Sequence, residues 1–135
     1  MEATLQTAFG FEIRSPLGFD ETVASVKEAF KVQGFGVLTE IDVQKTLREK
    51  IGADMPPYLI LGMCNPVLAH NALTSNPKIG LLLPCNVVVR TQDGSVLVDA
   101  QNPDILLEVV GDPAIAPIAR AATDLIKNAL RSLGF

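Results

Sequence analysis

Two apolar segments in the middle of the chain decide the fold: Tyr-Leu-Ile-Leu-Gly-Met-Cys-Asn-Pro at residues 58–66 and Ile-Gly-Leu-Leu-Leu-Pro-Cys-Asn-Val-Val-Val-Arg at residues 79–90. Both are apolar at successive positions, which is typical of strands that are covered on both faces. The chain's two cysteines, Cys64 and Cys85, and its single histidine, His70, lie in this region. We therefore expect the two segments to be neighbouring inner strands around which the rest of the chain packs.

The remaining segments predict an α+β fold, with helices covering a mostly antiparallel sheet. Strand patterns occupy residues 7–14, 35–41 and 95–100, and helix patterns occupy residues 20–33, 42–51, 67–74, 103–110 and 113–133. Asp93-Gly94 is a strong hairpin signal, so at least part of the sheet is antiparallel. Pro84 has no N–H to donate to a sheet, which predicts a bend, a bulge or an edge at Pro84-Cys85.

Length and composition indicate one domain over residues 1–135. Hydrophobic residues make up 48% of the chain and charged residues only 19%, enough for a packed core and too little charge for disorder. The net charge is −4 and no basic cluster occurs, which argues against a nucleic-acid partner. No apolar run approaches the ~18 residues that span a bilayer, and the N-terminus lacks a secretory pattern. We expect a cytoplasmic protein without a membrane partner.

The spacing of Cys64 and Cys85 matches no zinc-ligand pattern, and free thiols are expected in a reducing compartment. If the two apolar segments pair as simple antiparallel neighbours, the cysteines lie about 15–20 Å apart, at ~3.3 Å per residue. A disulfide needs Cα atoms within about 7 Å. We therefore expect neither a disulfide nor a Cys–Cys–His metal site, and no cofactor.

Cys64, Asn65 and His70 form the first candidate site. Cys64 ends a predicted strand beside a helix N-terminus, where backbone N–H groups and the helix dipole favour an anion. His70 lies one turn along that helix, away from the centre of its apolar face. One interpretation is a thiolate–imidazole pair or an anion pocket. The other is a packed cysteine, a surface or interface histidine, and an Asn65-Pro66 helix cap, which cap chemistry explains fully.

Pro84-Cys85-Asn86 forms the second candidate site, because polar residues interrupt a buried strand there. Asn86 either holds a ligand or satisfies a neighbouring backbone group at a structural bulge. The candidate ligand-binding set is thus Cys64, Asn65, His70, Cys85 and Asn86. We expect a module that binds a small molecule or a protein partner without catalysis. A thiol-dependent enzyme or redox sensor using Cys64 and His70, and a transition-metal binder, are the alternatives.

Because the two middle segments are apolar on both faces, the second face of the sheet must also be shielded from water. Either the short middle helices or a second subunit shields it. We expect a homodimer.

Three stretches carry a family resemblance: residues 34–43 (Gly-Phe-Gly-Val-Leu-Thr-Glu-Ile-Asp-Val), residues 62–66 with Ala69-His70, and residues 79–89. Together they resemble the bacterial and archaeal family called domain of unknown function 302, over nearly the whole chain. The resemblance implies a fold similar to the TATA-box-binding-protein-like α+β class, with a helical insertion and a dimeric state. It implies no activity, and a fold shared with a DNA-binding protein is analogy alone.

Overall fold

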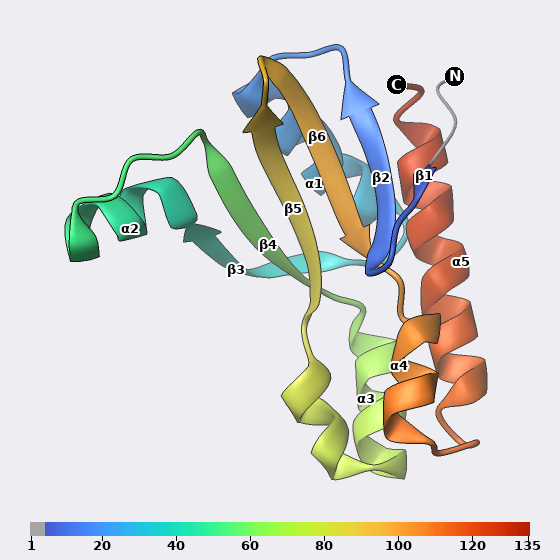
Figure 1. Cartoon of the computed structure of the whole chain (residues 1–135). Coiled ribbons are helices and arrows are strands. Elements are labelled where there is room, and N and C mark those ends of the chain that lie inside the picture. The colour runs from blue at the N-terminus through green and yellow to red at the C-terminus, as the bar shows by residue number, and fades with distance from the viewer. Residues whose placement is uncertain (1–4) are drawn as a thin grey trace.

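A six-stranded sheet forms the centre of the computed structural model, which describes residues 5–135 except for the side chains of residues 106–108. The strands stand in the order β1-β2-β6-β5-β4-β3, and every neighbouring pair is antiparallel (Figure 1). Their bounds are Leu5–Gln6 (β1), Gly10–Ser15 (β2), Gly36–Asp42 (β3), Tyr58–Cys64 (β4), Cys85–Gln92 (β5) and Ser95–Gln101 (β6). The predicted α+β class with a mostly antiparallel sheet is confirmed.

Helices α1 and α5 cover one face of this sheet (Figure 1). The helical segments are α1 (Phe19–Val32), α2 (Val43–Ile51), α3 (Pro66–Ser75), the 3-10 helix η1 (Pro77–Leu82), α4 (Asp104–Val110) and α5 (Ala116–Ser132). Buried side chains from both helices and four strands form the main core, including Phe11, Ile13, Val26, Phe30, Leu61, Met63, Val87, Val89, Val98, Ile126 and Leu130. This face therefore holds most of the apolar burial that stabilises the fold.

The segment predicted as one strand over residues 79–90 divides at Pro84. Residues 77–82 form η1, and β5 begins only at Cys85. The predicted interruption at Pro84-Cys85 is confirmed, but it separates a 3-10 helix from a strand. Asn76 caps η1, since its Oδ1 accepts a hydrogen bond from the Lys78 N–H at 3.1 Å, and Pro77 takes the first helical position. The leucines at residues 81–83 are compatible with a helix or a strand. The Asn76 cap and Pro77 therefore determine that the segment begins as a helix.

The two middle strands are neighbours, as predicted. In the β4–β5 pair Leu61 lies opposite Val87, and Met63 lies opposite Cys85. The predicted hairpin between β5 and β6 is also confirmed, with Asp93 at φ 52° and Gly94 at φ 78°. Both values lie in the left-handed region that a tight two-residue hairpin turn requires.

Of the two kinds of cover expected for the second face of the middle strands, the short middle helices do not supply it within residues 5–135, and cover by a second subunit stays a prediction. Helices α3 and α4 and the η1 segment lie beyond one end of the sheet, and no described helix lies across its second face (Figure 1). We call this second surface the open face. Half-buried apolar residues such as Ile60 and Val88 occupy it. A strand buried on one face usually alternates apolar and polar residues in the sequence. Because apolar residues also occupy the open face here, the sequence resembles that of a strand buried on both faces.

An arm made of β3 and α2 extends away from the body of the molecule (Figure 1). The Asp42 cap of α2 is present, because its Oδ1 accepts a hydrogen bond from the Lys45 N–H at 2.9 Å. None of the nine residues of α2 is buried. Leu38, Ile41 and Ile51 leave 66%, 47% and 73% of their surface exposed. The arm therefore carries apolar surface that the single chain does not use. None of the described helices has the length and apolar character needed to cross a membrane.

Candidate functional site

An apolar cavity of about 320 Å³ lies where the end of β4 and the start of β5 meet helices α3 and α5. Alanines supply much of the helical wall, namely Ala69, Ala72, Ala119 and Ala122. Their short side chains leave space that a larger residue would fill. The other lining residues are Phe35, Leu38, Met63, Cys64, Asn65, Leu68, Leu73, Ile79, Leu83, Pro84, Cys85, Pro103, Ile115 and Ile118. The wall is thus almost entirely apolar apart from one amide and two thiols.

The structure brings Cys64 and Cys85 together, so the predicted separation of 15–20 Å is wrong. Cys85 lies opposite Met63, the residue directly before Cys64. The two strands are antiparallel neighbours as assumed, but η1 takes up residues 77–82, so β5 starts at the cysteine itself. Both cysteines are free and partly buried, and both line the apolar cavity.

The environment of Cys85 opposes its ionisation. Burial, with a smaller contribution from the nearby charge of Cys64, raises the pKa of the Cys85 thiol to about 11. Cys85 is therefore a protonated thiol at neutral pH, which is the form that packs as a small apolar side chain.

Asn65 and His70 have different surroundings. The Asn65 Oδ1 accepts a hydrogen bond from the Leu68 N–H at 3.2 Å, and Pro66 takes the first position of α3, so the predicted helix cap is confirmed. Asn65 also lines the apolar cavity. His70 is exposed and is not among the lining residues. The structure therefore does not join His70 and Cys64 in one pocket.

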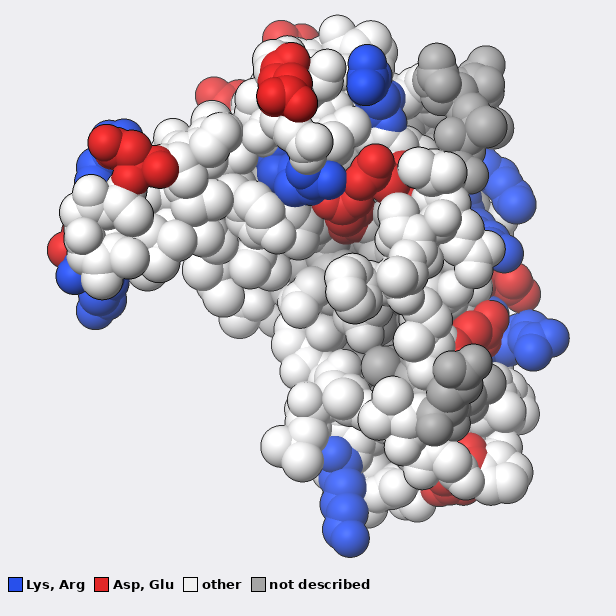
Figure 2. All heavy atoms as spheres, in the orientation of Figure 1, with Lys and Arg blue, Asp and Glu red and all other residues white. Residues whose placement is uncertain are grey.

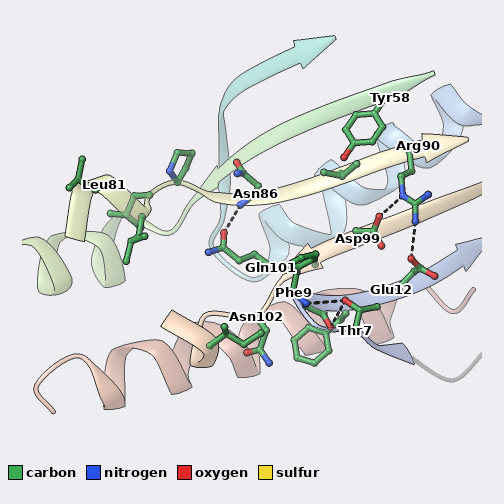
Figure 3. A pocket seen from close by; sticks show the side chains of 18 residues that line it. Thr7, Phe9, Glu12, Tyr58, Leu81, Asn86, Arg90, Asp99, Gln101 and Asn102 are labelled. Atoms are coloured by element: carbon green, nitrogen blue, oxygen red, sulfur yellow. Dashed lines mark hydrogen bonds and ion pairs between the residues drawn. The ribbon is translucent and has the colours of Figure 1, made fainter. Parts of the chain in front are cut away.

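Asn86 lies on the open face, in a depression of about 670 Å³ that is separate from the apolar cavity (Figure 3). Its backbone N–H donates to Gln101 Oε1 at 3.0 Å. Phe9 and Leu81, which are 86% and 91% exposed, also line this depression. Of the five candidate residues, Cys64, Asn65 and Cys85 thus share one cavity, while Asn86 and His70 lie elsewhere.

A charge cluster at the floor of the depression escaped the sequence analysis. Arg90 Nε donates to Asp99 Oδ2 at 2.6 Å, and Arg90 Nη2 donates to Glu12 Oε2 at 2.9 Å (Figure 3). Glu12 and Asp99 lie directly opposite each other on β2 and β6. Glu12 and Arg90 are 78 positions apart, so only the strand order reveals the cluster.

The two carboxyl groups of this cluster influence each other. A hydrogen bond with Asp99 raises the pKa of Glu12, and burial and the Asp99 charge act in the same direction, while Arg90 opposes them. The same carboxylates raise the pKa of Arg90, chiefly through its hydrogen bond to Asp99. The guanidinium is thus engaged within the chain and is not a free anion-binding group.

On the visible surface, charged side chains lie at the tip of the arm, on the upper part of the body, along the right edge and at the lower end (Figure 2). The hollow between the arm and the lower helices is largely uncharged. Within the described residues, no group of three or more His, Cys, Asp and Glu side chains is arranged to hold a metal ion.

Comparison with known proteins supports the family resemblance. The family model described as "Domain of unknown function DUF302" matches residues 11–133. A crystal structure of an uncharacterized conserved protein DUF302 from Bacillus stearothermophilus is similar at 32% identity and a TM-score of 0.86, covering 93% of this chain and 98% of that one. No curated protein matches the chain. The chain belongs to the DUF302 family.

Proposed function

We propose that this protein is a non-catalytic binding module that holds a small apolar molecule in the cavity between the sheet and helices α3 and α5. The observation that carries the proposal is the cavity itself, about 320 Å³ with an alanine-rich helical wall. Ligand sites are typically concave, mostly apolar and about 300 Å³ or larger, with a few polar groups for orientation. Here Asn65 and the two thiols are those polar groups.

The size and chemistry of the wall limit the occupant. A dry apolar cavity of about 150 Å³ takes a benzene ring, so a cavity of about 320 Å³ suits two fused rings or a short branched chain. Among the lining residues that the structure describes, no Lys, Arg, Asp, Glu or His provides a counter-charge. An uncharged molecule is therefore favoured over an ion of similar size, because burying an unpaired charge is costly.

The arrangement of the thiols favours binding over catalysis. A thiol-dependent enzyme needs a base within hydrogen-bond reach of its nucleophile. His70, the base that the sequence suggested, is exposed and outside the cavity. The raised pKa of Cys85, about 11, keeps that thiol protonated at neutral pH.

The uncharged dye 1-N-phenylnaphthylamine, which fluoresces strongly in apolar surroundings, tests the proposal. We expect saturable fluorescence with the intact chain and at least tenfold weaker binding to Ala122→Phe, which fills the cavity from α5. Ala121→Phe is the matched control, because it adds the same ring to the same helix at a residue that does not line the cavity. Thermal unfolding shows that each variant is folded. Equal dye binding by both variants, or none by the parent chain, would refute the proposal.

We also propose that the chain works as a homodimer that buries the open face. Apolar side chains are exposed around this face, at Phe9 and Leu81, and on the arm, at Leu38 and Ile51. Arg90 already pairs with two carboxylates there, so burying it costs less than burying a free charge. A second copy offers matching apolar surface from its own arm and sheet, as a symmetric interface requires.

Light scattering at micromolar concentration measures the mass directly. We expect twice the 14.4 kDa of one chain for the parent protein and a single-chain mass for Val88→Arg, which places a charge on the open face. Ala24→Arg on the exposed side of α1 is the control and keeps the double mass. A single-chain mass for the parent protein contradicts the dimer.

A further inference from the structure

Three sulfur-containing residues, Met63, Cys64 and Cys85, line the sheet end of the apolar cavity. Met63 and Cys85 lie directly opposite each other on β4 and β5, and Cys64 is the next residue along β4. All three side chains line the same cavity. Directly opposed side chains on antiparallel strands have Cβ atoms about 4.5–5.5 Å apart. The strand register therefore places Met63 beside Cys85, and the cavity lining adds Cys64 to the same stretch of wall.

The two thiols are close enough to influence each other. The charge of Cys64 contributes to raising the pKa of Cys85, second to burial. Among the described lining residues, Asn65 is the one other polar residue, and none of them besides the two cysteines is titratable. In such apolar surroundings a bound cation would offset the negative charge of two thiolate ligands.

We propose that Met63, Cys64 and Cys85 bind a soft monovalent cation of the Cu(I) class, with two thiolates as the main ligands and the thioether as the third. Thiolate and thioether sulfur are the ligands that select Cu(I). The site suits zinc poorly, because zinc in structural sites takes four donors from Cys, His, Asp or Glu. Within the described lining of the cavity, only the two cysteines belong to that group.

The binding step is a ligand exchange without electron transfer. The two S–H bonds break, two Cu–thiolate bonds and one Cu–thioether bond form, and two protons leave to solvent, so the oxidation states of copper and sulfur are unchanged. The complex carries one net negative charge. The N-terminus of α3, which begins directly after Asn65, is oriented to favour that charge. Because each bound ion displaces up to two protons, the apparent affinity falls by up to about 100-fold for each pH unit of acidification.

This inference goes beyond the proposed binding of an apolar molecule, because the sulfur ligands bind the ion whether or not the remaining cavity is filled. Anaerobic titration of the reduced protein with Cu(I), in competition with the chromogenic chelator bicinchoninate, measures the affinity and the stoichiometry. We expect one Cu(I) per chain, with thiolate-to-copper charge-transfer absorption in the ultraviolet. The dye assay runs on the metal-free protein, so the two proposals fail independently.

Four variants assign the ligands. Cys64→Ser and Cys85→Ser should each lose competition with the chelator, and Met63→Leu, which conserves volume, should weaken binding about tenfold. Met55→Leu is the matched control, since Met55 does not line the cavity, and it should bind as the parent chain does. Circular dichroism checks that each variant is folded. A rise in the melting temperature of the parent chain on adding Cu(I) supports the site without any variant. Undiminished binding in both Cys64→Ser and Cys85→Ser, or no binding by the reduced parent chain, overturns the proposal.

Discussion

Gly10, the first residue of β2, should tolerate no side chain. A Cβ atom built there would lie 2.0 Å from the carbonyl oxygen of Ala100 and 2.9 Å from its carbonyl carbon. Both atoms belong to the backbone of β6, so no rotamer change relieves the contact. Gly10→Ala therefore requires the two strands to move apart by about 1.4 Å or more to restore ordinary contact distances.

The cost follows from what this movement disrupts. The Thr7 N–H donates to the Gly10 carbonyl at 2.7 Å, the Gly10 N–H donates to Thr7 Oγ1 at 3.1 Å, and the Asn102 N–H donates to the Phe9 carbonyl at 3.3 Å. Each hydrogen bond contributes about 0.5–1.5 kcal/mol, and overpacking alone costs about 1–3 kcal/mol. We expect a loss of about 3 kcal/mol, which lowers the melting temperature by about 10 °C in a chain of 135 residues.

Thermal and urea unfolding of Gly10→Ala and Gly36→Ala test the reasoning together. Gly36 begins β3, and a Cβ atom there meets nothing within 4 Å. Its alanine variant should be neutral or up to about 1 kcal/mol more stable, because alanine restricts the unfolded chain. If the two variants unfold within 0.5 kcal/mol of each other, roughly the precision of such measurements, the close approach of β2 and β6 is refuted.

Three further predictions concern the thiols, the charge cluster and the close packing of β3 against β4 at Gly62. In Cys64→Ser the charge of Cys64 is gone, but burial, the larger cause of the raised pKa of Cys85, remains. The Cys85 thiol should therefore still react with iodoacetamide at pH 8 at least about tenfold more slowly than a thiol of pKa 9.0; an ordinary rate contradicts its burial. Folding raises the pKa of Glu12 above 4.5, so the folded chain binds the proton of the Glu12 carboxyl group more tightly than the unfolded chain does. The stability that this bound proton contributes is lost as the pH rises through the pKa of the folded state. Glu12→Gln should therefore gain stability relative to the parent between pH 4 and 7, and a pH-independent difference in urea unfolding would count against the carboxyl pair. Gly62→Ala places Cβ 2.2 Å from Thr39 Oγ1 and 2.8 Å from Pro84 Cγ, so it should cost about 1–3 kcal/mol. Adding Thr39→Ala should recover part of that loss. If the effects of the two substitutions on the free energy of unfolding simply add, Gly62→Ala does not clash with the Thr39 side chain.

Local signals explain which parts of the fold were predictable from the sequence. Asp42, Asn65-Pro66 and Asp93-Gly94 act through hydrogen bonds and dihedral preferences within a few residues, and all three lie where the sequence placed them. Residues 79–83 carry no such preference, because a run of leucines suits a strand and a helix equally. Because residues 79–84 were predicted to belong to the strand, β5 was expected to begin too early in the chain, and the cysteines were expected to lie too far apart.

The site was predictable only in part, because it depends on register. Cys64, Asn65 and Cys85 share a cavity since β4 and β5 pair with Met63 opposite Cys85. A sequence alone does not define that pairing once a helical insertion of unknown length separates the strands. The cluster of Glu12, Arg90 and Asp99 likewise depends on the order and register of three strands, β2, β6 and β5.

One cavity supports both binding proposals, and thermodynamic linkage relates them. The three sulfur atoms occupy the sheet side of the wall, while the alanines that leave space are on α3 and α5. An apolar molecule in that space excludes water from the sulfur atoms, which favours a Cu–thiolate complex over hydrated Cu(I). By reciprocity, an ion that strengthens the binding of the apolar molecule has its own affinity raised by the same factor. An ion that instead draws Met63 and the two cysteines into the cavity reduces the available volume, and the coupling then has the opposite sign. The sign of the coupling between copper and dye therefore reports whether the sulfur ligands move when the ion binds.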